Sequence, residues 1–255
     1  MMKKTGKTGS SRVVVVMPAY NAEKTLKKTY DDIPKKLVDK IILVDDGSHD
    51  KTVRVAKRLG LETVIHPQNR GYGGNQKTCY TLALSEGAGV VVMIHPDYQY
   101  DSTLTGEMIA PILKGKYDIM FGSRIRTRQE ALAGGMPLYK YIFNRLLTIT
   151  QNIILGQNLS EYHTGFRAFN KKVLMTLPFH KFSDDFVFDQ DIVVSAIFSK
   201  FKIGEIPVPV RYFKEASSIN FKRSLKYGIE VLIDLKKYLL ASWGLYRSPI
   251  FVNKR

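Results

Sequence analysis

The feature that most constrains the fold of this chain is a run of five apolar residues, 90–94, that stops at once in polar residues. A strand that is apolar throughout, and not only at every second position, is typical of a parallel sheet buried on both faces. Pro96 cannot donate a hydrogen bond to a neighbouring strand, so we expect the strand to end there. In an open α/β sheet, ligands bind at the carboxyl ends of the strands. The sequence therefore predicts a site directly after this run.

The first half of the chain repeats this arrangement. Further strands are expected at 13–17, 41–44, 61–66 and 118–121, with helical spacing near 22–33, 50–59, 75–86 and 103–114. This alternation predicts an α/β fold with a mostly parallel sheet and helices on both faces. The second half is less regular, with helices expected at 138–155, 186–198 and 222–246, a strand or turn at 164–169 and two short strands within 202–213. We predict a disordered basic tail at 1–12, a catalytic domain at 13–215 and a C-terminal helical segment at 216–255.

The polar residues after the run at 90–94 suggest a metal site. His95, Asp97 and Gln99 alternate, so in an extended chain their side chains point the same way. One imidazole, one carboxylate and one amide oxygen suit a divalent cation such as Mg²⁺ or Mn²⁺, with phosphate oxygens completing the shell. The alternative is a strand that simply ends in an Asp-containing turn.

Charge and composition narrow the partners. The net charge of +16 favours polyanionic partners, which are nucleic acid, anionic lipid or phosphorylated substrates. Basic residues interleaved with exposed aromatic residues, as nucleic-acid binders carry, are not found, so we expect no nucleic acid partner. The single cysteine, Cys79, rules out an intramolecular disulfide and fits a cytoplasmic location. No run of about 18 apolar residues predicts a membrane span.

Six motifs occur in an order that resembles the family 2 glycosyltransferases of the GT-A fold, which is Rossmann-like. The similarity is greatest to the group of dolichyl-phosphate mannose synthases and polyprenyl-phosphate sugar synthases, and it extends over residues 13 to about 215. The motifs are Val-Met-Pro-Ala-Tyr-Asn (16–21), Val-Asp-Asp-Gly-Ser (44–48), Asn-Arg-Gly (69–71), His-Pro-Asp-Tyr-Gln (95–99), Gly-Ser-Arg (122–124) and Thr-Gly-Phe-Arg-Ala-Phe (164–169).

The resemblance implies roles for individual residues. Asp97 and Gln99 match the second and third positions of the family's Asp-x-Asp-x-Gln metal motif, whereas His95 stands where the family has its first aspartate. His95 either ligates the metal with an altered metal preference or contacts phosphate beside it. The expected nucleotide-binding residues are Pro18, Tyr20, Asn21, Asp45, Asp46 and Gly71, and those near the acceptor phosphate are Ser123, Arg124, Lys140 and Thr164.

Two kinds of acceptor remain open at this point. A phosphate acceptor is already anionic and needs mainly cationic positioning, which the basic residues Arg124, Arg126, Arg128, Lys140, Arg145 and Arg167 would supply. A hydroxyl acceptor needs a general base, for which Asp189 and Asp191 are the candidates. We therefore expect catalysis to depend on Asp97, Arg124, Asp189 and Asp191.

The sequence thus predicts an inverting glycosyltransferase that moves a hexose from a UDP- or GDP-linked sugar to a polyprenyl (dolichyl or undecaprenyl) phosphate. The alternatives are transfer to a saccharide hydroxyl in cell-surface polysaccharide assembly, or a non-catalytic nucleotide- or nucleic-acid-binding protein. The segment 221–247 has apolar residues at helical spacing, flanked by cations and by Tyr238, Trp243 and Tyr246. This pattern predicts peripheral binding to an anionic membrane surface, at its cytoplasmic face.

Overall fold

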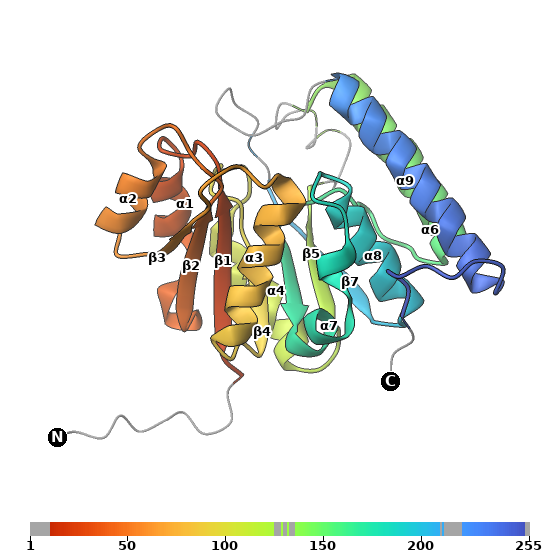
Figure 1. Ribbon diagram of the computed structural model, residues 1–255, viewed down its shortest axis with the longest axis horizontal. Coiled ribbons are helices and arrows are strands. Elements are labelled where there is room, and N and C mark those ends of the chain that lie inside the picture. Colours follow the sequence, from red (N-terminus) through yellow and green to blue (C-terminus); the bar gives the residue numbers. More distant parts are fainter. Residues whose placement is uncertain are drawn as a thin grey trace.

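The structure, a computed structural model, describes residues 11–124, 129, 132, 136–209, 211 and 221–252. In these ranges one seven-stranded sheet lies between two layers of helices, in the strand order β3–β2–β1–β4–β6–β5–β7 (Figure 1). The strands are β1 (Val13–Ala19), β2 (Lys40–Asp45), β3 (Glu62–Ile65), β4 (Val90–Met93), β5 (Ile119–Ser123), β6 (Arg167–Asn170) and β7 (Ile203–Pro207). The helices are α1 (Leu26–Asp32), α2 (Thr52–Arg58), α3 (Tyr72–Ser85), α4 (Thr105–Leu113), α6 (Leu138–Leu155), α7 (Lys171–Thr176), α8 (Phe188–Phe198) and α9 (Phe221–Ser242), with short 3₁₀ turns at Lys35–Leu37, Ser102–Leu104 and Phe179–Lys181.

The sheet is mostly parallel, as the alternation of strands and helices predicts. The exception is β6, which runs antiparallel to both β4 and β5. This strand begins three residues later than the predicted segment 164–169, because residues 160–166 form a loop under the carboxyl end of β5. Of the two short strands predicted within 202–213, only β7 is a strand in the described residues, and it ends at Pro207.

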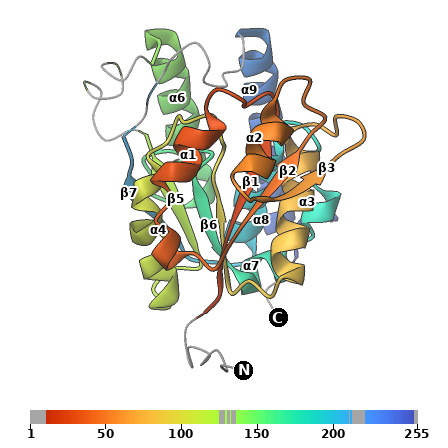
Figure 2. The ribbon, with the colours of Figure 1, turned by 90° about the vertical axis from the view of Figure 1, so that its left-hand side faces the viewer.

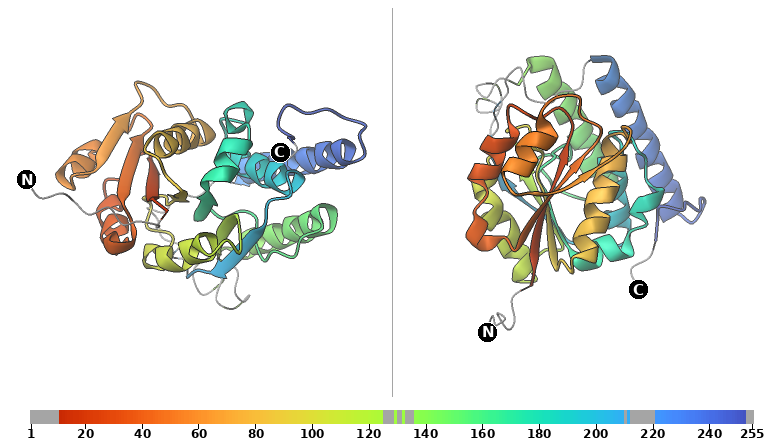
Figure 3. Two further views of the ribbon diagram at one scale, coloured as in Figure 1. Left: turned by 90° about the horizontal axis from the view of Figure 1, so that it is seen from below. Right: turned by 60° about the vertical axis from the view of Figure 1, so that its left-hand side comes forward.

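Both faces of the sheet are buried, which explains why its central strands are apolar throughout. Val14 and Val16 of β1 pack into the core beneath α3 and α8, whereas Val15 and Met17 point into the opposite core beneath α1 and α4. The view along the sheet in Figure 3 (left) shows the helices on its two sides. The expected covering of both faces is confirmed.

The strand order places a crevice where the predicted site residues lie. From β1 the chain adds β2 and β3 on one side and β4 on the other, so the connections diverge between β1 and β4. In a sheet of this kind the ligand crevice lies at the carboxyl ends of the strands at that point. In Figure 2 strand β1 runs upward, so its carboxyl end lies on the same side as the upper parts of α6 and α9.

Helices α6 and α9 lie side by side outside the sheet (Figures 1 and 3). They approach closely at Gly228, where an added Cβ would lie 2.8 Å from the Phe143 ring. Both helices expose apolar side chains, and we call this set the helix-pair surface: Leu138, Tyr139, Ile142, Phe143, Leu146, Ile149 and Ile153 of α6, with Leu225, Ile229, Leu232 and Ile233 of α9. None of the helices in the described ranges is both long enough and apolar enough to cross a bilayer.

Candidate active site

A cavity of about 590 Å³ lies between the sheet edge and the α6–α9 pair. One wall comes from the turn after β4 and from α3 and α8, with His95, Asp97, Gln99, Tyr100, Tyr72 and Asp189. The other wall comes from α6 and α9, with Tyr139, Lys140, Phe143, Asn144, Leu147, Arg223, Ser224, Leu225 and Tyr227. The segment predicted to follow the catalytic domain therefore supplies part of the cavity wall.

The three predicted metal-binding residues all line this cavity, although the chain is not extended there. Strand β4 ends at Met93, and the Asp97 carboxylate accepts a hydrogen bond from the Gln99 backbone N–H at 3.0 Å. Tyr98 between them has a φ of +59°, in the left-handed region that non-glycine residues rarely adopt. A tight turn thus gathers the side chains that sequence alternation was expected to align.

The donor set fits a divalent cation that is shared with a diphosphate. Burial lowers the pKa of His95 below its usual value despite the opposing effect of Asp97, so the imidazole is neutral and can donate a lone pair. Asp97 supplies a carboxylate and Gln99 an amide oxygen. Within the described residues no three His, Cys, Asp or Glu side chains gather as a metal cage, so phosphate oxygens would have to complete the shell.

Asp189, a predicted catalytic base, lies in the wall with both carboxylate oxygens engaged. Its Oδ2 accepts from the Tyr72 hydroxyl at 2.7 Å, and its Oδ1 accepts from the Gln76 amide at 3.2 Å. Arg167 lies 3.5 Å from the same Oδ1. The carboxylate is therefore a hydrogen-bonded, ion-paired group. Tyr72 and Gln76 were not predicted from the sequence. Nothing in the glycine-rich stretch at 71–74 indicates that they contact a residue more than a hundred positions away.

Asp191, the other predicted base, faces away from the cavity. It accepts a hydrogen bond from the Ser183 backbone N–H at 2.9 Å and lies against Asp234 of α9. Burial raises the pKa of Asp191 to about 7, and Asp234 contributes to the same rise. Because successive α-helical residues turn by about 100°, two residues separate these aspartates onto opposite sides of α8. The expectation that Asp191 acts in the site does not fit its position.

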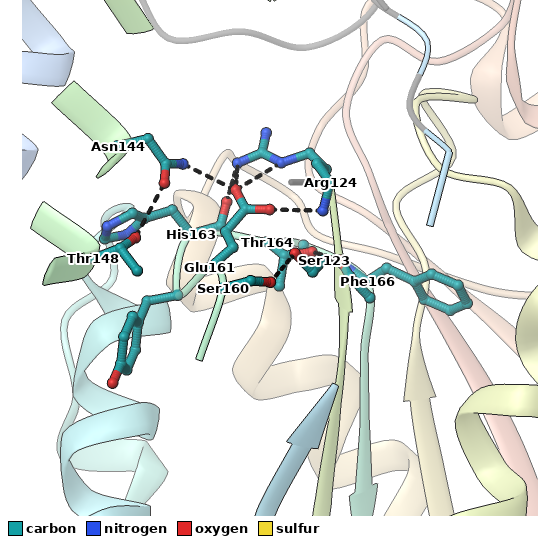
Figure 4. Close-up of polar contacts among 12 residues, drawn as sticks. Ser123, Arg124, Asn144, Thr148, Ser160, Glu161, His163, Thr164 and Phe166 are labelled. Carbon is teal, nitrogen blue, oxygen red and sulfur yellow. Dashed lines mark hydrogen bonds and ion pairs between the residues drawn. The ribbon is translucent and has the colours of Figure 1, made fainter. Parts of the chain in front are cut away.

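Arg124, predicted near the acceptor phosphate, lines the cavity but is paired with a buried carboxylate (Figure 4). Its backbone N–H donates to Glu161 Oε2 at 2.8 Å and its Nε donates to Glu161 Oε1 at 2.9 Å. Asn144 of α6 donates to the same Oε1 at 3.0 Å. Burial would raise the pKa of Glu161, but Arg124 holds it below its usual value. Sequence analysis missed Glu161, since a lone glutamate in a loop carries no pattern.

His163 links the loop before β6 to both helices of the other wall. Its Nδ1 lies 2.8 Å from the Tyr227 hydroxyl of α9, and its Nε2 lies 3.1 Å from the Gln151 amide of α6. Its backbone carbonyl accepts from the Arg124 guanidinium. Burial lowers the pKa of His163 to about 4, so the ring is neutral. His163 and Tyr227 were not predicted from the sequence.

The predicted basic cluster is only partly assembled in the described residues. Lys140 lines the cavity, where burial and Arg124 lower its pKa. Arg145 instead donates to the Ser160 carbonyl at 2.7 Å, and the fully buried Arg167 donates to the Asp189 carbonyl at 2.9 Å. These two arginines therefore hold the loop and α8 in place, contrary to the expected role at the phosphate. Arg126 and Arg128 lie outside the described residues.

Ser123 and Thr164, also predicted near the acceptor phosphate, are buried. The Ser123 hydroxyl lies 2.6 Å from that of Ser160, and the Thr164 hydroxyl donates to the Gly122 carbonyl at 2.5 Å. Neither side chain lines the cavity, whereas Gly165, the next residue, does. Both hydroxyls thus stabilise the loop against β5, which does not fit direct contact with an acceptor.

The predicted nucleotide-binding residues gather at the ends of β1 and β2. Tyr20 is half exposed, and Asn21 binds the 48–49 turn through its own N–H and its side-chain oxygen. Pro18 pairs with Val44 in the sheet. Asp45 has a buried Oδ1 without a hydrogen-bond partner.

Asp46 lies in the same group, and its carboxylate is used within the protein. It accepts from the backbone N–H groups of Arg70 and Gly71, at 2.9 and 3.1 Å, and lies 2.7 Å from His66 Nδ1. Gly71 has a φ of +86°, and an added Cβ there would lie 2.6 Å from the Asp184 carbonyl. Asp46 therefore shapes the glycine-rich loop, and its contact with a nucleobase stays a prediction.

Comparison with known proteins identifies the family. Residues 14–177 match glycosyl transferase family 2. The chain belongs to this family. A UDP-N-acetylglucosamine–dolichyl-phosphate N-acetylglucosaminyltransferase of Methanococcus voltae is 29% identical over 241 residues, covering 88% of this chain and 92% of that protein. An uncharacterized protein of Methanocaldococcus jannaschii is 30% identical over 210 residues, covering 81% and 84%.

Solved structures show the same fold. Glucosyl-3-phosphoglycerate synthase of Mycobacterium tuberculosis, crystallised with Mn²⁺ and UDP-glucose, has a TM-score of 0.69 and 21% identity, with 93% of this chain and 81% of that chain covered. The resemblance to family 2 and the GT-A type of α/β fold are thus confirmed. As a member of this family the chain is a glycosyltransferase, and the alternative of a non-catalytic binding protein is set aside.

Proposed function

We propose that this glycosyltransferase moves a hexose from a UDP- or GDP-linked sugar to a polyprenyl phosphate, while bound peripherally at the cytoplasmic face of a membrane. The observation that carries the acceptor assignment is the continuity between the cavity and the helix-pair surface. Tyr139, Phe143 and Leu225 line the cavity and also belong to the exposed apolar residues that form the helix-pair surface. A ligand with a phosphate head and an apolar chain matches a polar cavity that opens onto an apolar surface.

The state of the carboxylates also favours a phosphate over a hydroxyl acceptor. A hydroxyl would need a base with a free oxygen lone pair directed at it. Both oxygens of Asp189 already accept a hydrogen bond from the protein, which halves the lone pairs that could face a hydroxyl, and Asp191 lies outside the cavity. A phosphate oxygen needs no base, because it is already anionic.

The chemistry follows from this arrangement. An acceptor phosphate oxygen attacks the anomeric carbon from the face opposite the leaving group, forming a new C–O bond as the bond to the nucleoside diphosphate breaks with its electron pair. A bound Mg²⁺ or Mn²⁺ would be held by His95, Asp97 and Gln99 and would stabilise the negative charge of the leaving diphosphate. Lys140 and Arg124 lie where they can orient the acceptor phosphate, although Glu161 neutralises much of the charge of Arg124.

Membrane binding is supported by the composition of the same helix pair. The exposed fraction of Leu146 is 59% and that of Ile153 is 76%, and Trp243 follows α9 with 65%. Burying such side chains in a lipid interface stabilises binding by about 1.5–3 kcal/mol each when burial is complete. The charge of +16 attracts the chain to anionic headgroups. The relative named as a dolichyl-phosphate transferase is in keeping with a lipid phosphate acceptor.

The test is a lipid-extraction assay with radiolabelled UDP-glucose, UDP-N-acetylglucosamine and GDP-mannose, each offered with a polyprenyl phosphate and Mn²⁺. We expect one donor to label the organic phase, and the matched variant Asp97→Ala to leave it unlabelled. Label that appears only on an added saccharide would replace the lipid phosphate with a hydroxyl acceptor. Absence of transfer from all three donors to either acceptor would contradict the proposed activity.

A further inference from the structure

His95, which stands where family 2 enzymes have an aspartate, is part of a hydrogen-bonded chain of three side chains. The Tyr72 hydroxyl lies 3.2 Å from His95 Nε2 and 2.7 Å from Asp189 Oδ2. The three residues come from the turn after β4, from the first turn of α3 and from α8, so the fold brings them together from distant parts of the sequence. All three line the cavity.

The direction of each hydrogen bond can be assigned by starting from the carboxylate of Asp189. An ionised carboxylate can only accept, so the single Tyr72 proton is donated to Asp189. The Tyr72 oxygen must then accept from its other partner, and that partner is His95 Nε2. The proton of the neutral imidazole therefore resides on Nε2, which leaves the lone pair of the ring on Nδ1.

The remaining contacts hold the Asp189 side chain and the His95 ring in place. Gln76 donates to Asp189 Oδ1, and Arg167 lies 3.5 Å from the same oxygen, so the side chain has two further partners that fix its position. The same edge of the His95 ring meets Gly165, where an added Cβ would lie 2.7 Å from His95 Cδ2 and 3.1 Å from Nε2. Tyr72 packs in turn against Phe186, with ring centroids 4.7 Å apart.

We propose that the Asp189–Tyr72 relay fixes the tautomer of His95 so that Nδ1 ligates a divalent cation in the cavity, with Asp97 as the carboxylate ligand. This inference rests on the proposed function for the identity of the cation's partner, a nucleoside diphosphate. Nδ1 has no hydrogen-bond partner in the described part of the chain, and His95 lines the same cavity as Asp97. Histidine ligands in metal sites are commonly oriented by a hydrogen bond from their second ring nitrogen to an acceptor of this kind.

Two consequences follow for this enzyme. Tyr72 and Asp189 are positioning residues, and Asp189 acts through Tyr72 and not as a general base. A nitrogen ligand in place of an oxygen ligand also shifts the preference of the site from Mg²⁺ toward Mn²⁺, because imidazole binds the later first-row metals better than it binds magnesium.

The test uses the full-length protein with UDP and Mn²⁺, and compares the wild type with Tyr72→Phe. The phenylalanine keeps the ring that packs on Phe186 and removes only the hydroxyl. Tyr227→Phe is the matched control, since it removes a hydroxyl bound to His163 on the opposite wall of the same cavity. Mn²⁺ affinity is measured from the EPR signal of the free ion. We expect Tyr72→Phe to weaken Mn²⁺ binding by about 10- to 100-fold and the control to leave it within about two-fold.

Two spectroscopic readouts do not depend on turnover. Two-bond ¹H–¹⁵N correlation of the metal-free protein, with the His95 signals assigned by their loss in His95→Gln, should show the proton on Nε2 in the wild type and a tautomer mixture in Tyr72→Phe. Pulsed EPR of the Mn²⁺ complex should show coupling to a directly bound nitrogen that is absent in His95→Gln. A proton on Nδ1 in the wild type, or Mn²⁺ bound without nitrogen coupling, would overturn the proposal. If both signals are as expected while no sugar is transferred to lipid phosphate, the proposed function fails and the inference stands.

Discussion

The two walls of the cavity differ in the side chains that form them and in the contacts between those side chains. In the wall formed by the turn after β4, α3 and α8, polar side chains are linked to one another, and Asp189 alone binds three other side chains. In the wall formed by α6 and α9, five of the nine lining residues are aliphatic or aromatic, and three of these belong to the helix-pair surface. The first wall can hold charged groups at fixed positions, whereas the second offers an adaptable apolar surface. We infer that donor chemistry belongs to the first wall and acceptor specificity to the second.

The largest expected effect comes from a substitution in the polar wall, at the turn proposed to bind the metal. Asp97→Ala removes the carboxylate that shapes this turn and faces the cavity. We expect sugar transfer to fall by about 1,000-fold, the upper range for removal of one electrostatic group, with a far-UV circular dichroism spectrum like that of the wild type. The measurement is initial rate at saturating donor. Transfer within ten-fold of the wild-type rate would remove Asp97 from the proposed metal site.

The next largest effect concerns the ion pair between Arg124, directly after β5, and Glu161 in the loop before β6. Glu161→Gln keeps the shape of the side chain but leaves the mostly buried Arg124 without its counter-charge. Breaking a buried pair in this way costs about 3–5 kcal/mol of the free energy of unfolding, and urea denaturation measures it. Lys27→Gln, which breaks an exposed pair with Asp31 on α1, is the control and should change stability by less than about 1 kcal/mol. Equal effects in the two variants would mean that Arg124 finds another partner.

A smaller effect should appear with pH at the contact between α8 and α9. Because burial raises the pKa of Asp191 to about 7, the folded protein holds a proton there between about pH 4 and 7 that the unfolded chain releases. Stability should therefore fall as pH rises through this window. The groups that face Asp191 are the Ser183 N–H, Asp234 and Lys237. Asp191→Asn should remove this slope and stabilise the protein at pH 8 by an amount of order 1 kcal/mol, as thermal unfolding at pH 5 and 8 would show. A slope that persists in the variant would assign it to other groups.

The smallest effect on stability tests the helix-pair surface, which adjoins the apolar wall. Ile142→Ser and Ile229→Ser change the helix-pair surface at residues that do not line the cavity, and we expect stability to change by no more than about 0.5 kcal/mol. Flotation with vesicles containing anionic lipid should nevertheless show several-fold weaker binding. Met175→Ser, which changes a still more exposed apolar side chain on α7, is the control. Binding that weakens equally in all three variants, or in none, would contradict the proposal that the helix-pair surface binds the membrane.

The contrast between the walls also explains which parts of the fold and of the site can be predicted from the sequence. Apolar runs such as 90–94 predict the parallel sheet, because burial on both faces leaves a signal that one segment carries by itself. The polar residues that end this run do lie at the cavity, although a tight turn at Tyr98, and not an extended chain, brings His95, Asp97 and Gln99 together. Glu161, Tyr72 and Tyr227 could not be found in this way, since their importance comes from partners in other segments. The different environments of Asp189 and Asp191 depend on how α9 packs against α8. The spacing of residues along α8 carries no information about that packing.

The final turn of the described chain has a consequence for how this enzyme would meet a surface. After α9 the chain folds back, and Ser195 of α8 and Ser199, directly after α8, donate hydrogen bonds to the carbonyls of Ile250 and Val252 at 2.8 and 2.6 Å. Val231 and Leu235 in the middle of α9 are buried in the core beside α8. Deleting α9 would therefore expose the core, so point substitutions are the cleaner experiment. Because these contacts hold α9 along its length, the helix does not move independently of the sheet and α8. A membrane bound to the exposed side of α9 would therefore lie at a fixed distance and angle from the opening of the cavity.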